Sequence, residues 1–211
     1  GTNGFFIKTN FSSALADTYF TTTQQGKETI EFRIKPYRLE TNQHLFTLSG
    51  SSTDGSNYAP ANDQSLILQP YIGNDISSSN DSTQYGRIAL HRAGSDVEVT
   101  PYFPIYNGDF WNVFINANKN VSNEAEITFG AYQANFNQHI SSFTTSSTTP
   151  NYQFCWGLNH KGAKDAFFGG IPANTLANFN SIDGLRYSGS MQEIRIYLGE
   201  NLNTTTLKKH A

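Results

Sequence analysis

Apolar and polar residues alternate over many short stretches of the chain, a pattern typical of a β-strand with one buried face. The clearest example spans residues 29–36, where Ile30, Phe32 and Ile34 share one face and polar residues occupy the other. Proline cannot donate a hydrogen bond to a neighbouring strand, so this strand is predicted to end at Pro36. The same patterns predict further strands at 44–48, 65–71, 87–91, 96–102, 111–117, 126–132, 153–158 and 190–198.

The segments between these strands are rich in Gly, Asn, Asp, Ser and Thr, which favour turns and loops. Residues 141–150 are mostly Ser and Thr and are also interpreted as a loop. Helix is indicated only as a single turn at 175–178 and as a short C-terminal helix at 203–209, with an Asn or Thr cap and two lysines in its last turn. Many short strands separated by polar turns predict an all-β protein, a single antiparallel β-sandwich of jelly-roll type with one short C-terminal helix.

Composition supports this fold class and narrows the function. Of the 211 residues, 14% are aromatic and about 30% are Asn, Ser or Thr, and such residues suit strands and turns. The net charge of −3 supplies neither the basic surface that nucleic acid needs nor a polybasic stretch for an anionic membrane. No apolar run approaches the roughly 20 residues of a membrane-spanning helix. The partners are therefore expected to include no nucleic acid and no membrane insertion.

The length fits one domain that covers residues 1–211, because no internal repeat or compositional shift marks a linker. We expect this domain to come from a longer protein. The single cysteine, Cys155, excludes an internal disulfide framework. It lies in an apolar stretch with Trp156, and both side chains, together with Trp111, are expected to belong to the core.

Three segments, in order, resemble the concanavalin A-like lectin/glucanase superfamily, and within it the laminin-G-like domains. Residues 29–36 (Thr-Ile-Glu-Phe-Arg-Ile-Lys-Pro) are similar to an early strand of that family. Residues 108–113 (Gly-Asp-Phe-Trp-Asn-Val) resemble its Gly-x-Trp-x-x-Val strand opening, with Phe110 in the place of the tryptophan. Residues 187–197 (Tyr-Ser-Gly-Ser-Met-Gln-Glu-Ile-Arg-Ile-Tyr) match its closing strand nearly position for position, and this segment is the most specific of the three.

The resemblance implies which strands are neighbours. In the family the early strand and the closing strand pair, and here both carry Glu-x-Arg on the face opposite their aliphatic residues. Antiparallel pairing is predicted to place Glu31 near Arg195 and Arg33 near Glu193. If these ion pairs are exposed, each contributes at most about 1 kcal/mol, so their effect would be on register more than on stability.

The superfamily contains lectins, adhesion modules and glycoside hydrolases, so the fold alone does not decide the function. Its laminarinase-type hydrolases carry acidic residues at alternate positions of one strand, which places an acid and a nucleophile on one face. The nearest match here is the pair Glu124 and Glu126, which is better explained as a solvated entry to a strand. Glu28 and Glu31 are three residues apart and would face opposite sides of a strand. We therefore predict that the protein is not an enzyme.

Metal binding has little support in the sequence. The five histidines show no spacing that would bring two of them together as zinc ligands. Laminin-G-like domains often hold a calcium ion at one rim through aspartates, and a hard cation prefers such oxygen ligands. Aspartates in predicted loops could serve, but no spacing among them identifies a site: Asp54, Asp63, Asp75 and Asp81. We predict no cofactor and keep calcium as the open alternative.

A sugar site needs an exposed aromatic face for the sugar's C–H groups and planar polar groups for its hydroxyls. Predicted polar loops bring such residues together, and the candidates are Tyr58, Asn62, Asp63, Asn74, Tyr85 and His160. The prediction is a non-enzymatic carbohydrate-recognition or adhesion module of a larger surface protein of viral or phage type. Its partners would be a glycan or cell-surface carbohydrate and other domains or subunits of an assembly, and its location would be extracellular or on a virion surface.

Two alternatives to this prediction stay open. One is a purely structural building block of a virion or fibre, which has no glycan ligand and is marked by a large apolar patch. The other, with less support, is a glycoside hydrolase, which needs an acidic pair about 5 to 10 Å apart in a groove.

Overall fold

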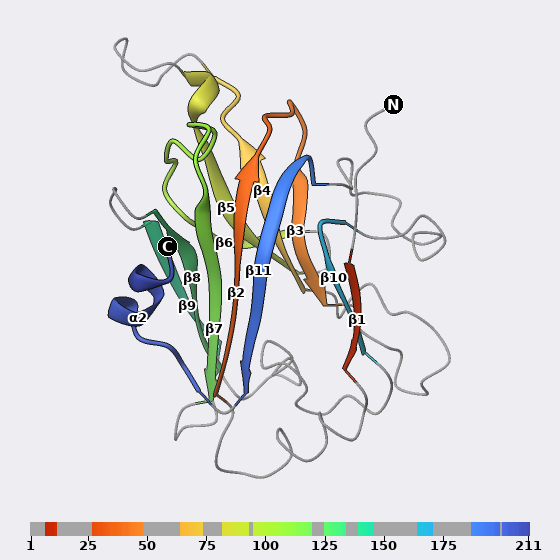
Figure 1. The fold of residues 1–211 in the computed structure, drawn as a ribbon, viewed down its shortest axis with the longest axis vertical. Helices are drawn as coiled ribbons and strands as arrows, with labels where there is room; N and C mark the ends of the chain where they lie inside the picture. The colour runs from red at the N-terminus through yellow and green to blue at the C-terminus, as the bar shows by residue number, and fades with distance from the viewer. Residues whose placement is uncertain are drawn as a thin grey trace.

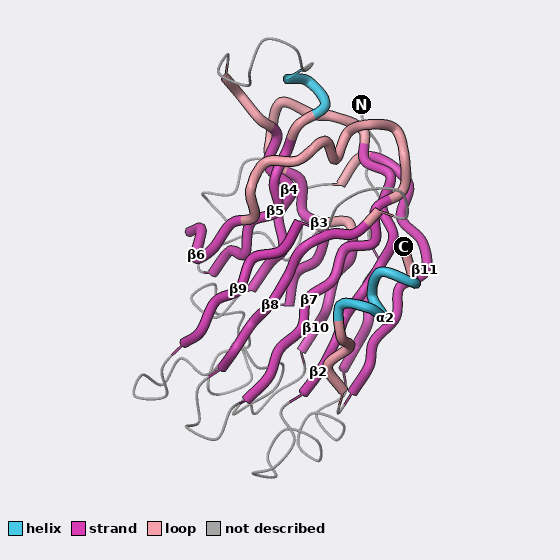
Figure 2. Tube along the Cα trace, turned by 90° about the vertical axis from the view of Figure 1, so that its left-hand side faces the viewer, coloured by secondary structure: helices cyan, strands magenta, loops and turns pink. Residues whose placement is uncertain are grey.

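The computed structural model describes residues 7–11, 27–48, 64–73, 82–92, 95–119, 125–133, 139–145, 164–170, 187–198 and 200–211. Two antiparallel sheets pack face to face (Figures 1 and 2). The six-stranded sheet has the order β1 (Ile7–Phe11), β10 (Lys164–Phe168), β3 (Gln43–Leu48), β4 (Gln64–Pro70), β5 (Gly86–Arg92), β6 (Ser95–Val99). The five-stranded sheet has the order β11 (Gly189–Leu198), β2 (Lys27–Pro36), β7 (Trp111–Lys119), β8 (Ala125–Tyr132), β9 (His139–Thr145).

The core lies between the two sheets and follows the alternation seen in the sequence. Ile30, Phe32 and Ile34 of β2 point into it and are almost fully buried. Phe32 meets Phe168 of β10 edge to face at 5.6 Å between ring centroids, so this aromatic pair joins the two sheets. Trp111 is fully buried in the same cluster, as predicted, whereas Trp156 and Cys155 lie outside the described residues.

The β-sandwich and most of its predicted strands are confirmed. Residues 96–102 are an exception, because β6 ends at Val99 and Pro101 cannot extend the ladder. The interpretation of 141–150 as a loop is wrong for residues 141–145, which belong to β9 at the edge of its sheet. Threonine favours strands, so a threonine-containing segment with few apolar residues can still form an edge strand. Strands β1 and β10 were not predicted, and the predicted elements at 153–158 and 175–178 lie outside the described residues.

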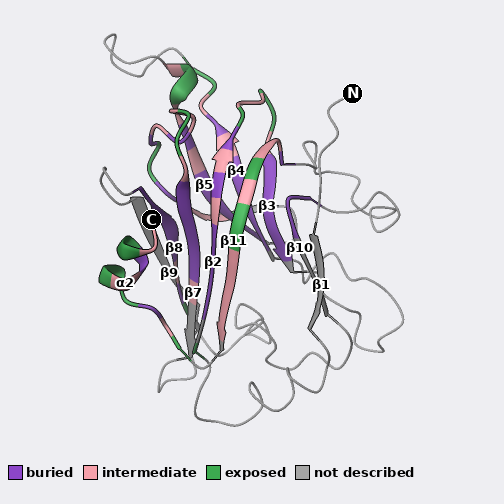
Figure 3. Ribbon diagram, viewed as in Figure 1, coloured by how far each residue is buried: buried purple, intermediate pink, exposed green. Residues whose placement is uncertain are grey.

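The predicted C-terminal helix is present as α2 (Thr204–Lys209), on the outer face of the five-stranded sheet (Figure 1). The Asn203 side chain accepts a hydrogen bond from the Thr206 backbone N–H at 2.9 Å and so caps its first turn. Leu207 packs with Phe114 and Tyr132, which are outward-facing residues of β7 and β8. A helix of six residues is not stable alone, so packing on the sheet holds α2 in place. Figure 3 shows its other side exposed.

The closing strand contains two backbone conformations that fix its path. Its register with β2 shifts between Gln192 and Arg195, and Glu193 within this bulge has a φ of 54°. Gly189 begins the strand with a φ of 141°, and a Cβ there would lie 2.3 Å from the Lys35 carbonyl oxygen. Only glycine fits this position, because both the conformation and the contact exclude a side chain.

Gly189→Ala is therefore expected to lower the free energy of unfolding by about 3 kcal/mol, since it combines backbone strain with a backbone clash. The matched control is Gly108→Ala. Gly108 also has a positive φ, of 85°, but a Cβ there would have no heavy atom within 4 Å, so strain alone should cost about 1 kcal/mol. Urea unfolding of both variants gives the comparison. Equal losses would show that the close approach of Gly189 to β2 is not what requires glycine.

Candidate functional site

Most residues predicted for a sugar or calcium site lie outside the described part of the chain. This holds for Tyr58, Asn62, Asp63, Asn74 and His160, and for Asp54, Asp75 and Asp81. Tyr85 is described and lies directly before β5. The Tyr71 backbone N–H donates to the Tyr85 carbonyl oxygen at 3.0 Å, so Tyr85 continues the pairing of β5 with β4.

The outer face of the six-stranded sheet carries a group of polar and aromatic side chains beside Tyr85. Gln69 of β4 and Arg87 of β5 are paired across the strands, and both alternate with inward-facing core residues, so they point away from the core. With Asp96 of β6 and with Tyr71 and Tyr102, which follow β4 and β6, they form what we call the platform. Gln69, Arg87 and Asp96 come from three neighbouring strands of one sheet, and the two tyrosines lie just beyond the ends of two of these strands.

The Asp96 carboxylate is the polar centre of the platform. Gln69 Nε2 donates to both carboxylate oxygens at 3.1 Å, and Arg87 Nη2 lies 3.6 Å from Oδ2. Arg87 Nε also donates to Gln69 Oε1 at 2.7 Å, and His91 Nε2 contacts Asp96 Oδ1. Ala89, between Arg87 and His91 on β5, contributes only a methyl group, which leaves room for these longer side chains to converge.

The two tyrosines supply the apolar part of the platform. The ring of Tyr102 meets that of Tyr71 edge to face, with 4.9 Å between centroids, and the Arg87 guanidinium lies over the Tyr102 ring at 5.0 Å. Tyr102 is 38% exposed, and the side chains of Arg87 and Asp96 are 27% and 35% exposed. Aromatic, amide and charged planar groups are thus accessible on one surface.

Arg38, from the segment that joins β2 to β3, fixes one end of the platform. Its Nη2 donates to the Tyr71 carbonyl oxygen at 2.8 Å and its Nη1 to that of Thr83 at 2.9 Å. Longer bonds reach the carbonyl oxygens of Ser82 and Tyr85, and Nε pairs with Glu40 at 3.1 Å. Because a guanidinium has five donors in a fixed plane, one arginine can hold several chain segments at once.

A row of buried polar side chains continues from the platform across the same sheet. His44 Nδ1 lies 3.1 Å from Thr47 Oγ1, which lies 2.8 Å from Ser65 Oγ. Burial lowers the pKa of His44 to about 4. Burial also lowers the pKa of His91, although the Asp96 charge opposes that shift. Both imidazoles are therefore neutral at neutral pH.

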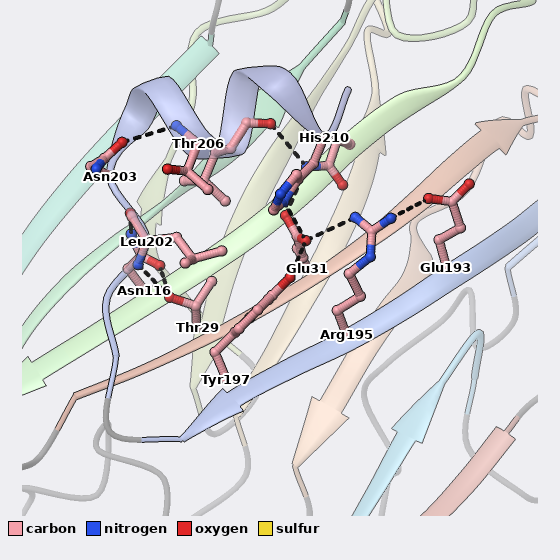
Figure 4. Close-up of polar contacts among 12 residues, drawn as sticks. Thr29, Glu31, Asn116, Glu193, Arg195, Tyr197, Leu202, Asn203, Thr206 and His210 are labelled. Carbon is pink, nitrogen blue, oxygen red and sulfur yellow. Dashed lines mark hydrogen bonds and ion pairs between the residues drawn. The ribbon is translucent and has the colours of Figure 1, made fainter.

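A second polar centre surrounds Glu31 on the outer face of the five-stranded sheet (Figure 4). Glu31 Oε1 accepts from Arg195 at 3.0 Å and from the Tyr197 hydroxyl at 3.1 Å, and His210 Nδ1 lies 2.8 Å away. Asn112 Nδ2 donates to Oε2 at 3.1 Å. Burial raises the pKa of this carboxyl, but the bonds from Asn112 and Arg195 and the charge of His210 outweigh it, and the pKa is lowered overall.

This centre confirms the predicted strand pairing. Arg195 lies opposite Glu31 in the register of β11 with β2, and Arg33 Nη1 lies 3.2 Å from Glu193 Oε1. The two pairs differ in exposure, because Glu31 is fully buried, whereas the Glu193 side chain is 38% exposed. His210 lies against Glu31, and the Glu31 side chain is fully buried, so this carboxylate binds groups of the fold itself.

Among the described residues, no group of three or more His, Cys, Asp or Glu side chains could hold a metal ion. No helix in the described part of the chain is long and apolar enough to cross a membrane.

Comparison with known proteins relates the fold to carbohydrate-binding modules. The chain matches no protein-family model and no curated protein by sequence. The CBM40 module of the IT-sialidase of Ruminococcus gnavus has a TM-score of 0.52 at 12% identity, over 98% of this chain and 95% of that chain. The same module bound to α2,6-sialyllactose has a TM-score of 0.51 at 14% identity, over 99% of this chain and 98% of that chain.

The fold is also similar to part of a phage protein. A full-length tailspike protein of Escherichia coli O157:H7 bacteriophage CAB120 has a TM-score of 0.50 at 14% identity, over 88% of this chain. The chain spans 22% of the length of that tailspike. These likenesses confirm the β-sandwich, and the laminin-G-like, concanavalin A-like assignment stays a prediction.

Proposed function

We propose that this chain is a non-catalytic carbohydrate-binding module and that the platform is its glycan contact surface. The observation that carries the proposal is the partly exposed Tyr102, whose ring contacts the Arg87 guanidinium, which in turn reaches the Gln69 amide and the Asp96 carboxylate. An aromatic ring packs against the C–H groups of a sugar, and planar polar groups bind its hydroxyls. The platform offers both, held in place by Arg38 and by strand pairing.

The comparisons support this proposal through the fold. The module of similar fold covers nearly the whole of this chain, and its bound ligand is sialyllactose. The similar part of the tailspike is 22% of a longer chain, which fits a module within a larger protein. We propose that the module is displayed outside a cell or on a virion surface, next to other domains or subunits, where a cell-surface glycan is its partner.

The proposal excludes hydrolysis. Of the described carboxylates, Glu31 is fully buried and held by four side chains, and Asp96 is the one acid in the platform, whereas glycoside hydrolysis uses two carboxyl groups. The protein should release no reducing sugar from β-glucans. Replacing both Glu124 and Glu126 with Gln should leave glycan binding unchanged. Turnover that disappears in this double variant would show that the protein is an enzyme.

The test of binding is a broad glycan array, with the protein presented multivalently, with and without calcium. Weak binding is expected for each site, with a Kd of about 0.1 to 1 mM, because few groups are desolvated. Tyr102→Ala should weaken binding at least tenfold, or about 1.4 kcal/mol, because the sugar loses its aromatic contact. Tyr85→Ala should also weaken binding, since Tyr85 adjoins the platform.

The matched control is Tyr37→Ala, because Tyr37 is a 63% exposed tyrosine outside the platform. This variant should bind the glycan as tightly as the wild type. The melting temperature of each variant shows whether the fold is kept. An array without a hit would favour the structural building block. Among the described residues, the exposed large apolar side chains are Tyr37, Ile72 and Tyr102, and such a block would use them in an interface.

A further inference from the structure

The charges of the platform balance each other. Arg87 Nη2 lies 3.6 Å from Asp96 Oδ2, its Nε donates to Gln69, and its Cζ lies over the Tyr102 ring at 5.0 Å from the centroid. His91, which contacts the same carboxylate, has a lowered pKa because it is buried, so it adds no positive charge at neutral pH. The cation and the anion of the platform are thus paired with each other before any ligand binds.

The second arginine near the platform, Arg38, is also fully engaged in hydrogen bonds within the protein. The Nε and Nη atoms of Arg38 donate to Glu40 and to the carbonyl oxygens of four residues: Tyr71, Ser82, Thr83 and Tyr85. Its Cζ also lies over the ring of Tyr106 at 5.9 Å. A ligand carboxylate could gain this cation only if bonds that hold the end of the platform were broken, which would cost more than the new ion pair returns.

Asp96 is the more exposed member of the ion pair, with 35% of its side chain accessible against 27% for Arg87. An ionised carboxylate can accept about four hydrogen bonds. Gln69 donates to both oxygens and His91 contacts Oδ1, whereas Arg87, at 3.6 Å from Oδ2, lies beyond hydrogen-bond distance. This leaves capacity for about one further donor at Oδ2. A sugar hydroxyl can supply that donor. A ligand carboxylate supplies no hydrogen at neutral pH and brings a second negative charge to the same place.

We propose that the ligand of the platform is a neutral, hydroxyl-rich sugar that donates a hydroxyl to Asp96, and that a sugar carrying a carboxylate there is disfavoured. This inference rests on the proposed function and names the ligand class for the same site. The ligand class proposed for this chain is neutral, whereas the sialyllactose bound to the CBM40 module carries a carboxylate. That module shares the fold with this chain at 14% identity, so a different charge pattern on the outer face is compatible with the likeness.

The experiment compares matched probes on one carrier: neutral oligosaccharides, such as lactose, and the same oligosaccharides capped with sialic acid or oxidised to the uronic acid. The wild-type protein should bind the neutral member of the best pair at least tenfold more tightly. In Asp96→Asn, which keeps the shape and removes the charge, this ratio should fall below about threefold. Salt offers a second measurement on the unmodified protein, since raising it from about 0.02 to about 0.5 M screens exposed charges and should narrow the ratio.

The possible outcomes separate the two proposals. If the acidic member binds as well as or better than the neutral one, and Tyr102→Ala abolishes that binding, the ligand class is wrong and the proposed function stands. If the ratio is the same in Asp96→Asn and at both salt concentrations, Asp96 does not set the preference and the inference is overturned. If no probe of either kind binds, the proposed function fails, and the ligand class fails with it.

Discussion

Replacing Glu31 with alanine is expected to lower the free energy of unfolding by about 3 to 5 kcal/mol, because it leaves buried partners of the carboxylate without their acceptor. The Asn112 amide would lose its bond to Oε2, and Arg195 and His210 would lose the charge that they face. For a chain of this length such a loss corresponds to a fall in melting temperature of roughly 10 °C. Calorimetry or urea unfolding measures it.

The control for this substitution lies in the same cluster. Glu193→Gln removes the partly exposed carboxylate that pairs with Arg33 and Arg195, and should cost less than about 1 kcal/mol because solvent screens that pair. The pKa of Glu31 is lowered in the fold, so its contribution is present above the ordinary value of 4.5 and is lost as the pH falls through the lower, folded value. Equal losses for the two variants would contradict the importance given to the buried carboxylate.

Stability is also expected to fall between about pH 6.5 and pH 4 because of His44. Burial lowers the pKa of this imidazole from 6.5 to about 4, so over that interval the unfolded chain binds a proton that the folded chain does not. The unfolded state is then favoured as the pH decreases, by up to about 3 kcal/mol if the whole shift is realised. The nearby Thr47 hydroxyl offers the neutral ring a hydrogen-bond partner.

Urea unfolding at pH 7, 6, 5 and 4 of the wild type and of His44→Gln tests this dependence. Glutamine can keep a bond to Thr47 and does not titrate, so the variant should lose clearly less stability over the same interval. His91 is present in both proteins, so the comparison isolates the titration of His44 together with its interaction with the His91 charge. If the free energy of unfolding falls equally with pH in both proteins, the acid sensitivity does not arise from His44.

The contacts that could be predicted from the sequence are those set by strand parity. The alternation in β2 and β11 placed Glu31 and Arg195 on one face, and the family resemblance made the two strands neighbours. The burial of Glu31 could not be predicted, because it depends on where a six-residue helix docks on the sheet. The sequence indicates where this helix begins and ends. The contact of Leu207 with Phe114, which holds the helix on the sheet, is a tertiary contact and cannot be read from the local sequence.

The platform was only partly predictable. The polar loop before β5 indicates Tyr85, whereas the alternation that predicts strands at 65–71 and 87–91 indicates no binding role for Gln69 and Arg87. Their parity was a usable signal, because both alternate with core aliphatic residues and therefore face outward. The contact of Asp96 with Gln69 could not be predicted from parity. It depends on the irregular register between β5 and β6, where the pairing shifts between Leu90 and His91.

The most direct test of the central claim is a chemical-shift titration of ¹⁵N-labelled protein with the strongest glycan found on the array. If the platform binds the glycan, the largest shifts should fall on the backbone amides of Gln69, Arg87, Asp96 and Tyr102, and α2 should be unaffected. Shifts concentrated at α2 and at the outer face of the five-stranded sheet, or at residues 58–63, would contradict the claim that the platform is the binding site.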